Sequence, residues 1–232
     1  MILSWQRKFI FLKTSKTAGT SLEIALSKYA TAEDIVTPIT PTDEDIRRAL
    51  GYCGPQNYLA PPGLLQKLGL KRPEKKFYNH IRAGVIRRVL GREVFDSFLK
   101  VAVVRNPFVL VVSRYFWTHR NDPSLSETHF RQWLLSRPEV LYENYQITRI
   151  DGVSVIDLMI RFEHFREDLG TFARRVGLPD TLYEEFNAIK AKGQFRPKRA
   201  NTHEMFKDFP EGRQVVAEMF AEDIAAYGYS CP

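Results

Sequence analysis

The sequence has few cysteines and no long apolar segment. These two absences argue against a disulfide-rich secreted domain and against a membrane-spanning protein. Its 232 residues include only two cysteines, Cys53 and Cys231, which lie far apart and show no metal-ligand spacing. Such a pair cannot supply the disulfide framework of a small secreted domain, so we expect free, partly buried thiols. The longest uncharged apolar run, residues 106–113, is far shorter than the roughly 20 residues of a membrane-spanning helix. We therefore expect no transmembrane segment.

Leader-like and low-complexity segments are also missing. Arg7, Lys8 and Lys13 interrupt the apolar residues near the start before they reach the length of a signal peptide. No Gly/Ser/Pro-rich linker divides the chain, and 44% of its residues are hydrophobic. The sequence therefore predicts a soluble, cytoplasmic protein with a single domain over residues 1–232.

Positive charge is in excess. Against 34 Lys and Arg there are 27 Asp and Glu, which gives a net charge of +7. This balance favours an anionic ligand, a property that nucleic-acid-binding proteins share with enzymes that act on nucleotides or acidic glycans. The charge alone does not distinguish these classes.

Strand-like and helix-like segments alternate along the chain. Short runs of β-branched and aromatic residues predict strands, and apolar residues at spacings of three and four predict helices. Because alternating strands and helices build a parallel sheet covered on both faces, we expect an α/β fold with a central parallel sheet flanked by helices. We expect strands over residues 7–14, 99–104 and 156–162, and helices over residues 22–29, 42–50, 64–70, 81–90, 108–119, 126–137, 165–176 and 211–227.

The first expected strand runs into a loop of small and hydroxyl-bearing residues that opens a helix. Such a loop directs main-chain N–H groups and the positive end of the helix dipole at one point, which suits a phosphate. Ala18 and Gly19 allow close approach of the backbone, and Lys16 adds a positive charge. The hydroxyl donors are Thr17, Thr20 and Ser21. The alternative interpretation is an ordinary helix cap beside a surface lysine.

The second buried strand ends in Arg105-Asn106-Pro107, and Ser113 follows on the next helix. This is a second candidate anion site, although a surface ion pair at Arg105 is the alternative. The chain lacks a Walker A loop, because Ile10 stands where that motif needs glycine. No aspartate ends the second strand to hold magnesium, so we expect no metal.

Two anion sites without a metal carboxylate suit a nucleotide that carries phosphates at both ends of its ribose. The stretch Phe-Leu-Lys-Thr-Ser-Lys-Thr-Ala-Gly-Thr-Ser-Leu, residues 11–22, resembles the 5′-phosphosulfate loop of sulfotransferases. Val103-Val104-Arg105-Asn106-Pro107, with Ser113 and Tyr115, resembles their 3′-phosphate motif. The resemblance is greatest to the carbohydrate sulfotransferase branch, which uses 3′-phosphoadenosine 5′-phosphosulfate (PAPS). It extends loosely over nearly the whole chain and implies a P-loop-like three-layer fold.

The resemblance also implies roles for individual residues. Lys16 would stabilise the leaving 5′-phosphate oxygen, with help from Thr20 and Ser21. Arg105 and Ser113 would hold the 3′-phosphate and orient the donor. A basic segment around residues 196–203 resembles a lid over the nucleotide, and from it Lys198, Asn201 and Thr202 are expected to bind the donor. Two departures from the family pattern are Leu110, where an arginine is frequent, and Ser15, where many members have proline.

A general base is also needed, because a protonated hydroxyl is a poor nucleophile. His80 precedes the helix expected over residues 81–90, where the hexuronic-acid sulfotransferases of this family place their base, and we expect its pKa near the ordinary value of about 6.5. A helix-capping role for His80 and a carboxylate base such as Glu163 remain alternatives. The other histidines, for which structural or binding roles are favoured, are His119, His129, His164 and His203.

The expected reaction is transfer of a sulfuryl group from PAPS to a hydroxyl. The expected acceptor is a sugar, a glycolipid or a polysaccharide. Residues 31–76 match nothing in the family pattern, and acceptor selection is expected to reside there. A P-loop-type kinase, which would need magnesium ligands, is one alternative. A basic nucleic-acid-binding module is the other, although no DNA- or RNA-binding motif is present.

Overall fold

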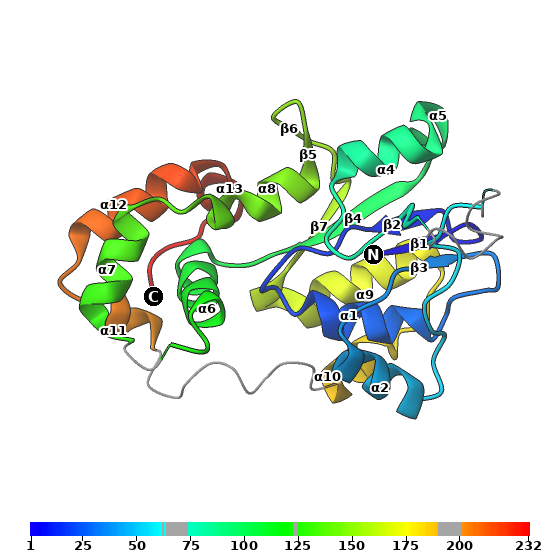
Figure 1. The fold of residues 1–232 in the computed structure, drawn as a ribbon, viewed down its shortest axis with the longest axis horizontal. Coiled ribbons are helices and arrows are strands. Elements are labelled where there is room, and N and C mark those ends of the chain that lie inside the picture. Colours follow the sequence, from blue (N-terminus) through cyan, green and yellow to red (C-terminus); the bar gives the residue numbers. More distant parts are fainter. Residues whose placement is uncertain (62, 64–73, 123–124, 190–200) are drawn as a thin grey trace.

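The computed structural model describes residues 1–61, 63, 74–122, 125–189 and 201–232. Its centre is a five-stranded sheet in the order β3-β1-β2-β4-β7, flanked by helices (Figure 1). The strands are β1 (Ile2–Ser4), β2 (Phe9–Phe11), β3 (Ile35–Val36), β4 (Leu99–Val104) and β7 (Leu158–Arg161). The expected α/β class with a helix-flanked central sheet is thereby confirmed.

The sheet is mixed, so the expectation of an entirely parallel sheet is wrong at one side. Strands β2, β4 and β7 are parallel, with Phe9 opposite Leu99 and Val101 opposite Leu158. Strand β1 is antiparallel to both β2 and β3. Only residues 5–8 join β1 to β2, and so short a connection permits a hairpin but no parallel crossover.

Alternation along the strands divides the interior between the two faces of the sheet. Phe9 and Phe11 enter a core with α1 (Gly19–Ser27), α9 (Phe165–Val176) and α10 (Leu182–Ala188). Ile10, between them, enters the opposite core with α4 (Ala83–Leu90) and α5 (Arg92–Ser97). The period of two therefore produces three layers. Helix α2 (Pro41–Ala49) adds Ile46 to the core that contains α1, α9 and α10.

The remaining helices gather beside the sheet around a third core (Figure 1). Aromatic rings dominate it, and Phe108 meets Phe206 edge to face at 5.3 Å between centroids. The expected single domain over residues 1–232 stays a prediction. The elements here are α6 (Pro107–Thr118), α7 (Glu127–Leu135), η1 (Glu139–Tyr142), α8 (Glu143–Thr148), α11 (Thr202–Phe206), α12 (Pro210–Met219) and α13 (Ala221–Tyr227).

Short elements complete the chain. Strands β5 (Arg149–Ile150) and β6 (Val153–Ser154) form a separate hairpin, and the 3₁₀ turn η2 (Phe162–His164) follows β7. The helix expected over residues 211–227 is two helices, α12 and α13, which meet at the buried Phe220. The segment expected as a helix over residues 64–70 lies outside the described residues. Within the described ranges, no helix combines the length and the apolar character needed to cross a membrane.

Candidate anion-binding site

Residues 12–18, between β2 and α1, form the candidate phosphate loop, which we call the anion loop. Lys16 and Ala18 adopt left-handed backbone conformations, with φ of 64° and 59°. Ala18 is the N-cap of α1 and gives the helix no side-chain cap. The first turn of α1 contains Gly19, Thr20 and Ser21, all buried. Main-chain N–H groups at this helix end have no intrahelical partner, so the turn is suited to an anion.

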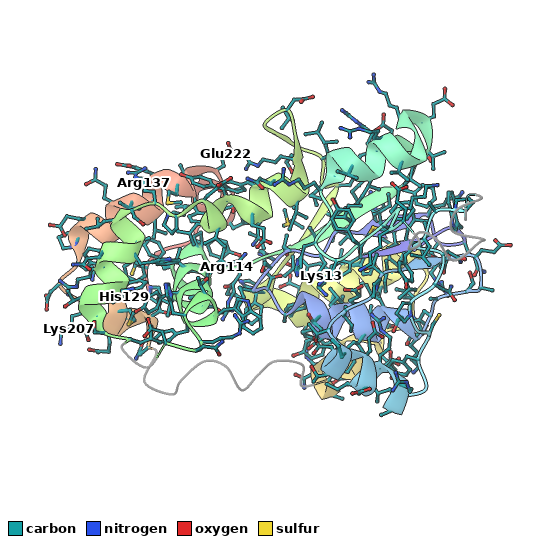
Figure 2. The ribbon with its side chains drawn as sticks, viewed as in Figure 1. Lys13, Arg114, His129, Arg137, Lys207 and Glu222 are labelled. Carbon is teal, nitrogen blue, oxygen red and sulfur yellow. The ribbon has the colours of Figure 1, made fainter. Side chains whose placement is uncertain are left out.

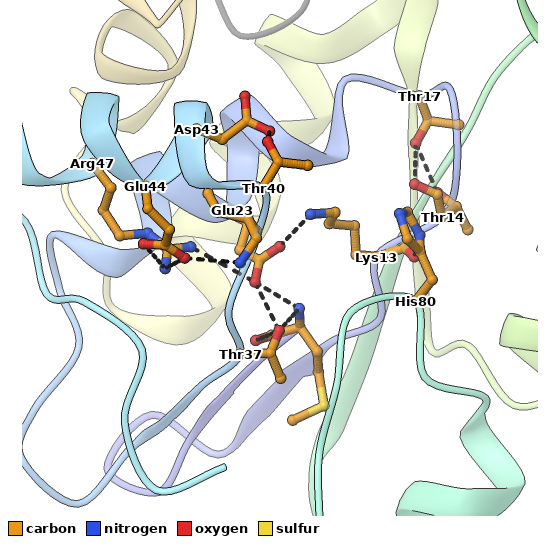
Figure 3. A network of polar contacts seen from close by, with 12 residues as sticks. Lys13, Thr14, Thr17, Glu23, Thr37, Thr40, Asp43, Glu44, Arg47 and His80 are labelled. Atoms are coloured by element: carbon orange, nitrogen blue, oxygen red, sulfur yellow. Dashed lines mark hydrogen bonds and ion pairs between the residues drawn. The ribbon is translucent and has the colours of Figure 1, made fainter. Parts of the chain in front are cut away.

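Two threonines shape the loop internally (Figure 3). The Thr14 hydroxyl donates to the Val103 carbonyl at 2.6 Å, which ties the loop to β4. The Thr17 hydroxyl lies 2.8 Å from Thr14 Oγ1 and 3.2 Å from the Thr14 carbonyl, and Thr17 is buried. The Thr17 side chain, predicted from sequence to donate to a ligand, is therefore directed into the loop itself.

A buried ion pair lies beneath the anion loop (Figure 3). Lys13 Nζ contacts Glu23 Oε2 at 2.7 Å, and Thr37 donates to the other Glu23 oxygen at 3.0 Å. Burial opposes ionisation of Glu23, but Lys13 and the other neighbouring cations hold its pKa well below the usual range. A Cβ atom at Gly19 would lie 2.9 Å from Lys13 Cγ and 3.1 Å from the Thr14 carbonyl oxygen. Lys13 therefore sets the shape of the loop, and glycine at position 19 is required by its close approach.

Lys16, Arg105 and Trp117 meet at the carboxyl edge of β2 and β4. Lys16 Nζ lies 4.3 Å from the centroid of the Trp117 ring. Arg105 donates from Nη1 to the Lys16 carbonyl at 3.0 Å, and its guanidinium lies 4.2 Å from the centroid of Phe162. Ser113 stands four residues before Trp117 on α6, and both positions are half-buried while residues 110–112 and 114–116 are buried. Ser113 therefore shares the α6 face that carries the lysine-bound tryptophan.

The start of α6 is fixed by residues from distant parts of the chain. Asn106 caps the helix by accepting from Phe108 N at 3.0 Å. Glu163 Oε1 accepts from Asn106 N at 2.8 Å, and its Oε2 accepts from the Tyr229 hydroxyl at 3.0 Å. Both oxygens of Glu163, the alternative base, are thus engaged at the start of α6.

His80 lies against the anion loop. Its Nδ1 is 2.9 Å from the Lys13 carbonyl oxygen. A carbonyl only accepts, so Nδ1 carries the proton and Nε2 keeps its lone pair. Burial, followed by the Lys13 cation, lowers the pKa of His80 to about 4 instead of the expected 6.5 or so. The imidazole of His80 is therefore neutral near pH 7. The N-cap of α4 is Arg82, so His80 does not cap this helix, and its ring contacts the anion loop instead.

Two of the three expected lid residues, Asn201 and Thr202, belong to the described part of the chain. Asn201 caps α11 by accepting from His203 N at 2.9 Å, and Thr202 is buried in the first turn. Phe206 of α11 packs on Phe108, which places this short helix beside α6. Lys198 lies outside the described residues. His129 belongs to an aromatic cluster in the helical part (Figure 2), with Nδ1 at 3.0 Å from the Tyr115 hydroxyl.

Helix α8 was not expected from sequence, yet it touches the anion loop. Asn144 Oδ1 accepts from Ser15 N at 2.7 Å, and Asn144 Nδ2 donates to the Ser15 carbonyl at 3.1 Å. Glu143, the preceding residue, forms an ion pair with Arg114 of α6. With six residues and no apolar period, α8 offers no sequence signal that could have revealed these contacts. Trp117 and Phe162 were missed for another reason, because an aromatic residue next to a buried segment is ordinary core.

A cavity of about 170 Å³ adjoins the anion loop. Thr14 and Arg105 form part of its wall, and Asn144 of α8 and Asp223 of α13 lie on other sides. Burial raises the pKa of Asp223. In the part of the chain that the structure describes, no three His, Cys, Asp or Glu side chains are grouped so that they could hold a metal ion.

One known protein is similar to part of this chain. A protein of Archaeoglobus fulgidus, whose name reads "Uncharacterized protein", is 28% identical over 108 residues. The matched region is 45% of this chain and 89% of that protein. No family model matches the sequence, and no solved structure matches it.

Proposed function

We propose that the protein is a sulfotransferase with a P-loop-like three-layer fold, which transfers a sulfuryl group from PAPS to a hydroxyl of a sugar, glycolipid or polysaccharide. The observation that carries the proposal is the hydrogen bond of Arg105 to the Lys16 carbonyl. It joins two strand-to-helix loops on adjacent parallel strands. A ligand with two phosphates on one ribose would contact both.

The anion loop fits the 5′-phosphate end of such a donor. Gly19 leaves no room for a side chain, and the first turn of α1 has no side-chain cap. Its N–H groups and Lys16 Nζ would balance the charge of the 5′-phosphate. Arg105 and Ser113 would take the 3′-phosphate at the start of α6, with Asn201 and Thr202 of α11 beside them.

His80 would accept the proton of the attacking hydroxyl at Nε2. The new bond joins the acceptor oxygen to sulfur, and the bond from sulfur to the 5′-phosphate oxygen breaks with its electron pair on that oxygen. Lys16 stabilises this oxygen, where charge develops. A base with a pKa of about 4 is too weak to ionise an alcohol beforehand, so proton transfer must accompany formation of the oxygen–sulfur bond.

The test is thermal unfolding with the spent nucleotide, 3′-phosphoadenosine 5′-phosphate, in the absence of magnesium. A ligand that binds only the folded state raises the melting temperature, so we expect a concentration-dependent increase. Arg105→Ala should lose the increase. Arg92→Ala should keep it, because Arg92 is exposed and pairs only locally with Asp96 on α5.

The two alternatives give different results in the same assay. A kinase would be stabilised more by ATP with magnesium than by the bisphosphate. A nucleic-acid-binding module would bind oligonucleotides strongly, with an affinity that falls steeply with salt. Once the bisphosphate binds, transfer of labelled sulfate to a panel of sugars and glycolipids identifies the acceptor.

A further inference from the structure

Helix α8 contacts all three segments on which the proposed function rests. Asn144 bonds to Ser15 in the anion loop, and Glu143 pairs with Arg114 on α6, the helix that carries Ser113. Gln146 accepts from Arg82, two residues after His80. These three α8 residues lie within one turn of each other. A helix this short gains little stability from its own hydrogen bonds, so its position depends on such contacts.

Asn144 makes the most direct of these contacts. Its side-chain amide makes two hydrogen bonds to the backbone of one residue. Asn144 Oδ1 accepts from Ser15 N at 2.7 Å, and Asn144 Nδ2 donates to Ser15 O at 3.1 Å. Ser15 is buried. The Ser15 N–H is therefore committed to Asn144.

The second bond determines which way the next N–H points. The Ser15 carbonyl and the Lys16 N–H belong to the same planar trans peptide, so they point in opposite directions. Because the carbonyl points at Asn144, the Lys16 N–H points away from α8. On its other side, the Lys16 carbonyl is held by Arg105 at 3.0 Å. Both peptides that flank Lys16 are thus fixed by side chains from outside the loop.

These hydrogen bonds on both sides of Lys16 explain its left-handed backbone conformation. A φ of 64° is unfavourable for a residue with a side chain, and such conformations persist where their surroundings fix them. We propose that Asn144 is a positioning residue for the anion loop, which orients the Lys16 N–H and side chain for the phosphate. The role in donor binding rests on the proposed function. The effect on the loop backbone does not.

The test compares Asn144→Ala with a control that removes the same kind of bonds elsewhere. Asn57 also has a positive φ, and its amide donates to the carbonyls of Ala32 at 2.8 Å and Asp34 at 2.9 Å, outside the anion-binding site. Asn57→Ala should lower the melting temperature without changing the loop. Asn144→Asp is a second, nearly isosteric variant, which keeps an acceptor for Ser15 N–H and places a carboxylate oxygen against the Ser15 carbonyl.

Two quantities are measured: hydrogen exchange of the amides of residues 14–18, and affinity for 3′-phosphoadenosine 5′-phosphate by calorimetry. We expect Asn144→Ala to speed the exchange and to weaken the affinity by about 5- to 150-fold, the range for two net hydrogen bonds. Asn144→Asp should weaken it at least as much, because its added negative charge lies beside an anion site. Asn57→Ala should leave both quantities unchanged.

The outcomes separate the two proposals. Wild-type exchange and affinity in Asn144→Ala, with only a lower melting temperature, would overturn the positioning role and leave Asn144 as an anchor of α8. If the wild-type protein does not bind the bisphosphate but Asn144→Ala still speeds exchange of the loop, the proposed function fails and the positioning of the loop stands.

Discussion

The pKa of His80 makes a quantitative prediction about stability. Burial and the Lys13 cation lower this pKa from an ordinary 6.5 to about 4. At about 1.36 kcal/mol per pKa unit, protonating His80 in the folded protein costs about 3.4 kcal/mol more than in the unfolded chain. The unfolded chain therefore binds the proton first as the pH falls, and the folded state loses stability between pH 6.5 and pH 4.

The size of the effect follows from the two pKa values. Between pH 7 and pH 5, His80 alone should reduce the free energy of unfolding by about 2 kcal/mol. For a chain of this length, that is a decrease in melting temperature of roughly 4 °C. Other groups titrate in the same range, so the effect must be measured as a difference between two proteins.

His80→Asn is the appropriate comparison. His80 has a φ of 56°, and asparagine tolerates this left-handed conformation better than most residues. Urea unfolding of both proteins at pH 7 and pH 5 should show a decrease about 2 kcal/mol larger in wild type. Equal decreases would mean that His80 accepts a proton as freely in the folded as in the unfolded state, which would refute its buried, neutral form. A neutral His80 also predicts that turnover shows no inflection near pH 6.5 from this group.

Four substitutions test the rest of the site, and a fifth, Gly170→Ala, is the control for Gly19→Ala. Gly19→Ala should destabilise the protein by about 1–3 kcal/mol in urea unfolding and prevent binding of the bisphosphate, because the new Cβ meets buried atoms. Gly170→Ala in α9, where the nearest atom is a flexible arginine tip at 3.5 Å, should be neutral or stabilising. Arg105→Ala should weaken nucleotide affinity by about 10- to 150-fold in calorimetry, and an unchanged affinity would remove it from the 3′-phosphate site. Lys16→Met should reduce single-turnover rate more than nucleotide affinity, and the reverse pattern would give it a binding role. Glu23→Gln should cost about 3–5 kcal/mol of stability, since it leaves buried cations uncompensated, and a cost below about 1 kcal/mol would contradict the buried ion pair.

The sequence predicts correctly those helices and strands that have a long apolar pattern and a residue typical of a helix end, such as glycine. Helix α9 spans Phe165–Val176 as expected, because its apolar residues recur at helical spacing and Gly177 ends it in a left-handed conformation. Strand β4 was located because six consecutive residues suit a buried strand. The strand-loop-helix reading of residues 7–29 was also correct in outline, although β2 contains only Phe9–Phe11.

Errors arose where tertiary packing overrides local pattern. Strand β1 has three residues, too few for a period, and it exists only through pairing with β2 and β3. The C-terminal helix breaks because Phe220 turns into the helical core. The helix expected over residues 42–50 begins one residue earlier, at Pro41: Thr40 is the N-cap of α2, and its hydroxyl contacts Asp43.

Some features of the candidate site can be predicted from the sequence, and others depend on tertiary contacts. The sequence predicts that Lys16 and Arg105 serve one site, and the structure brings them together; their roles toward a ligand stay a prediction. The lowered pKa of His80 is not, because it depends on burial and on Lys13, 67 residues away in sequence. The bonds between Asn144 and Ser15 span 129 residues and leave no periodic trace.

The parallel part of the sheet has a consequence for how the chain folds. Phe9 pairs with Leu99 and Val101 with Leu158, so the two central ladders join segments far apart in sequence. Closing such long loops before their contacts form is entropically costly, and folds rich in these pairings fold slowly. The hairpin of β1 and β2 is different, because residues 5–8 alone join its strands. We expect pulse-labelling during refolding to show protected amides in the β1–β2 hairpin before β4, so that the anion loop is assembled in a slow phase, when β4 pairs with β2.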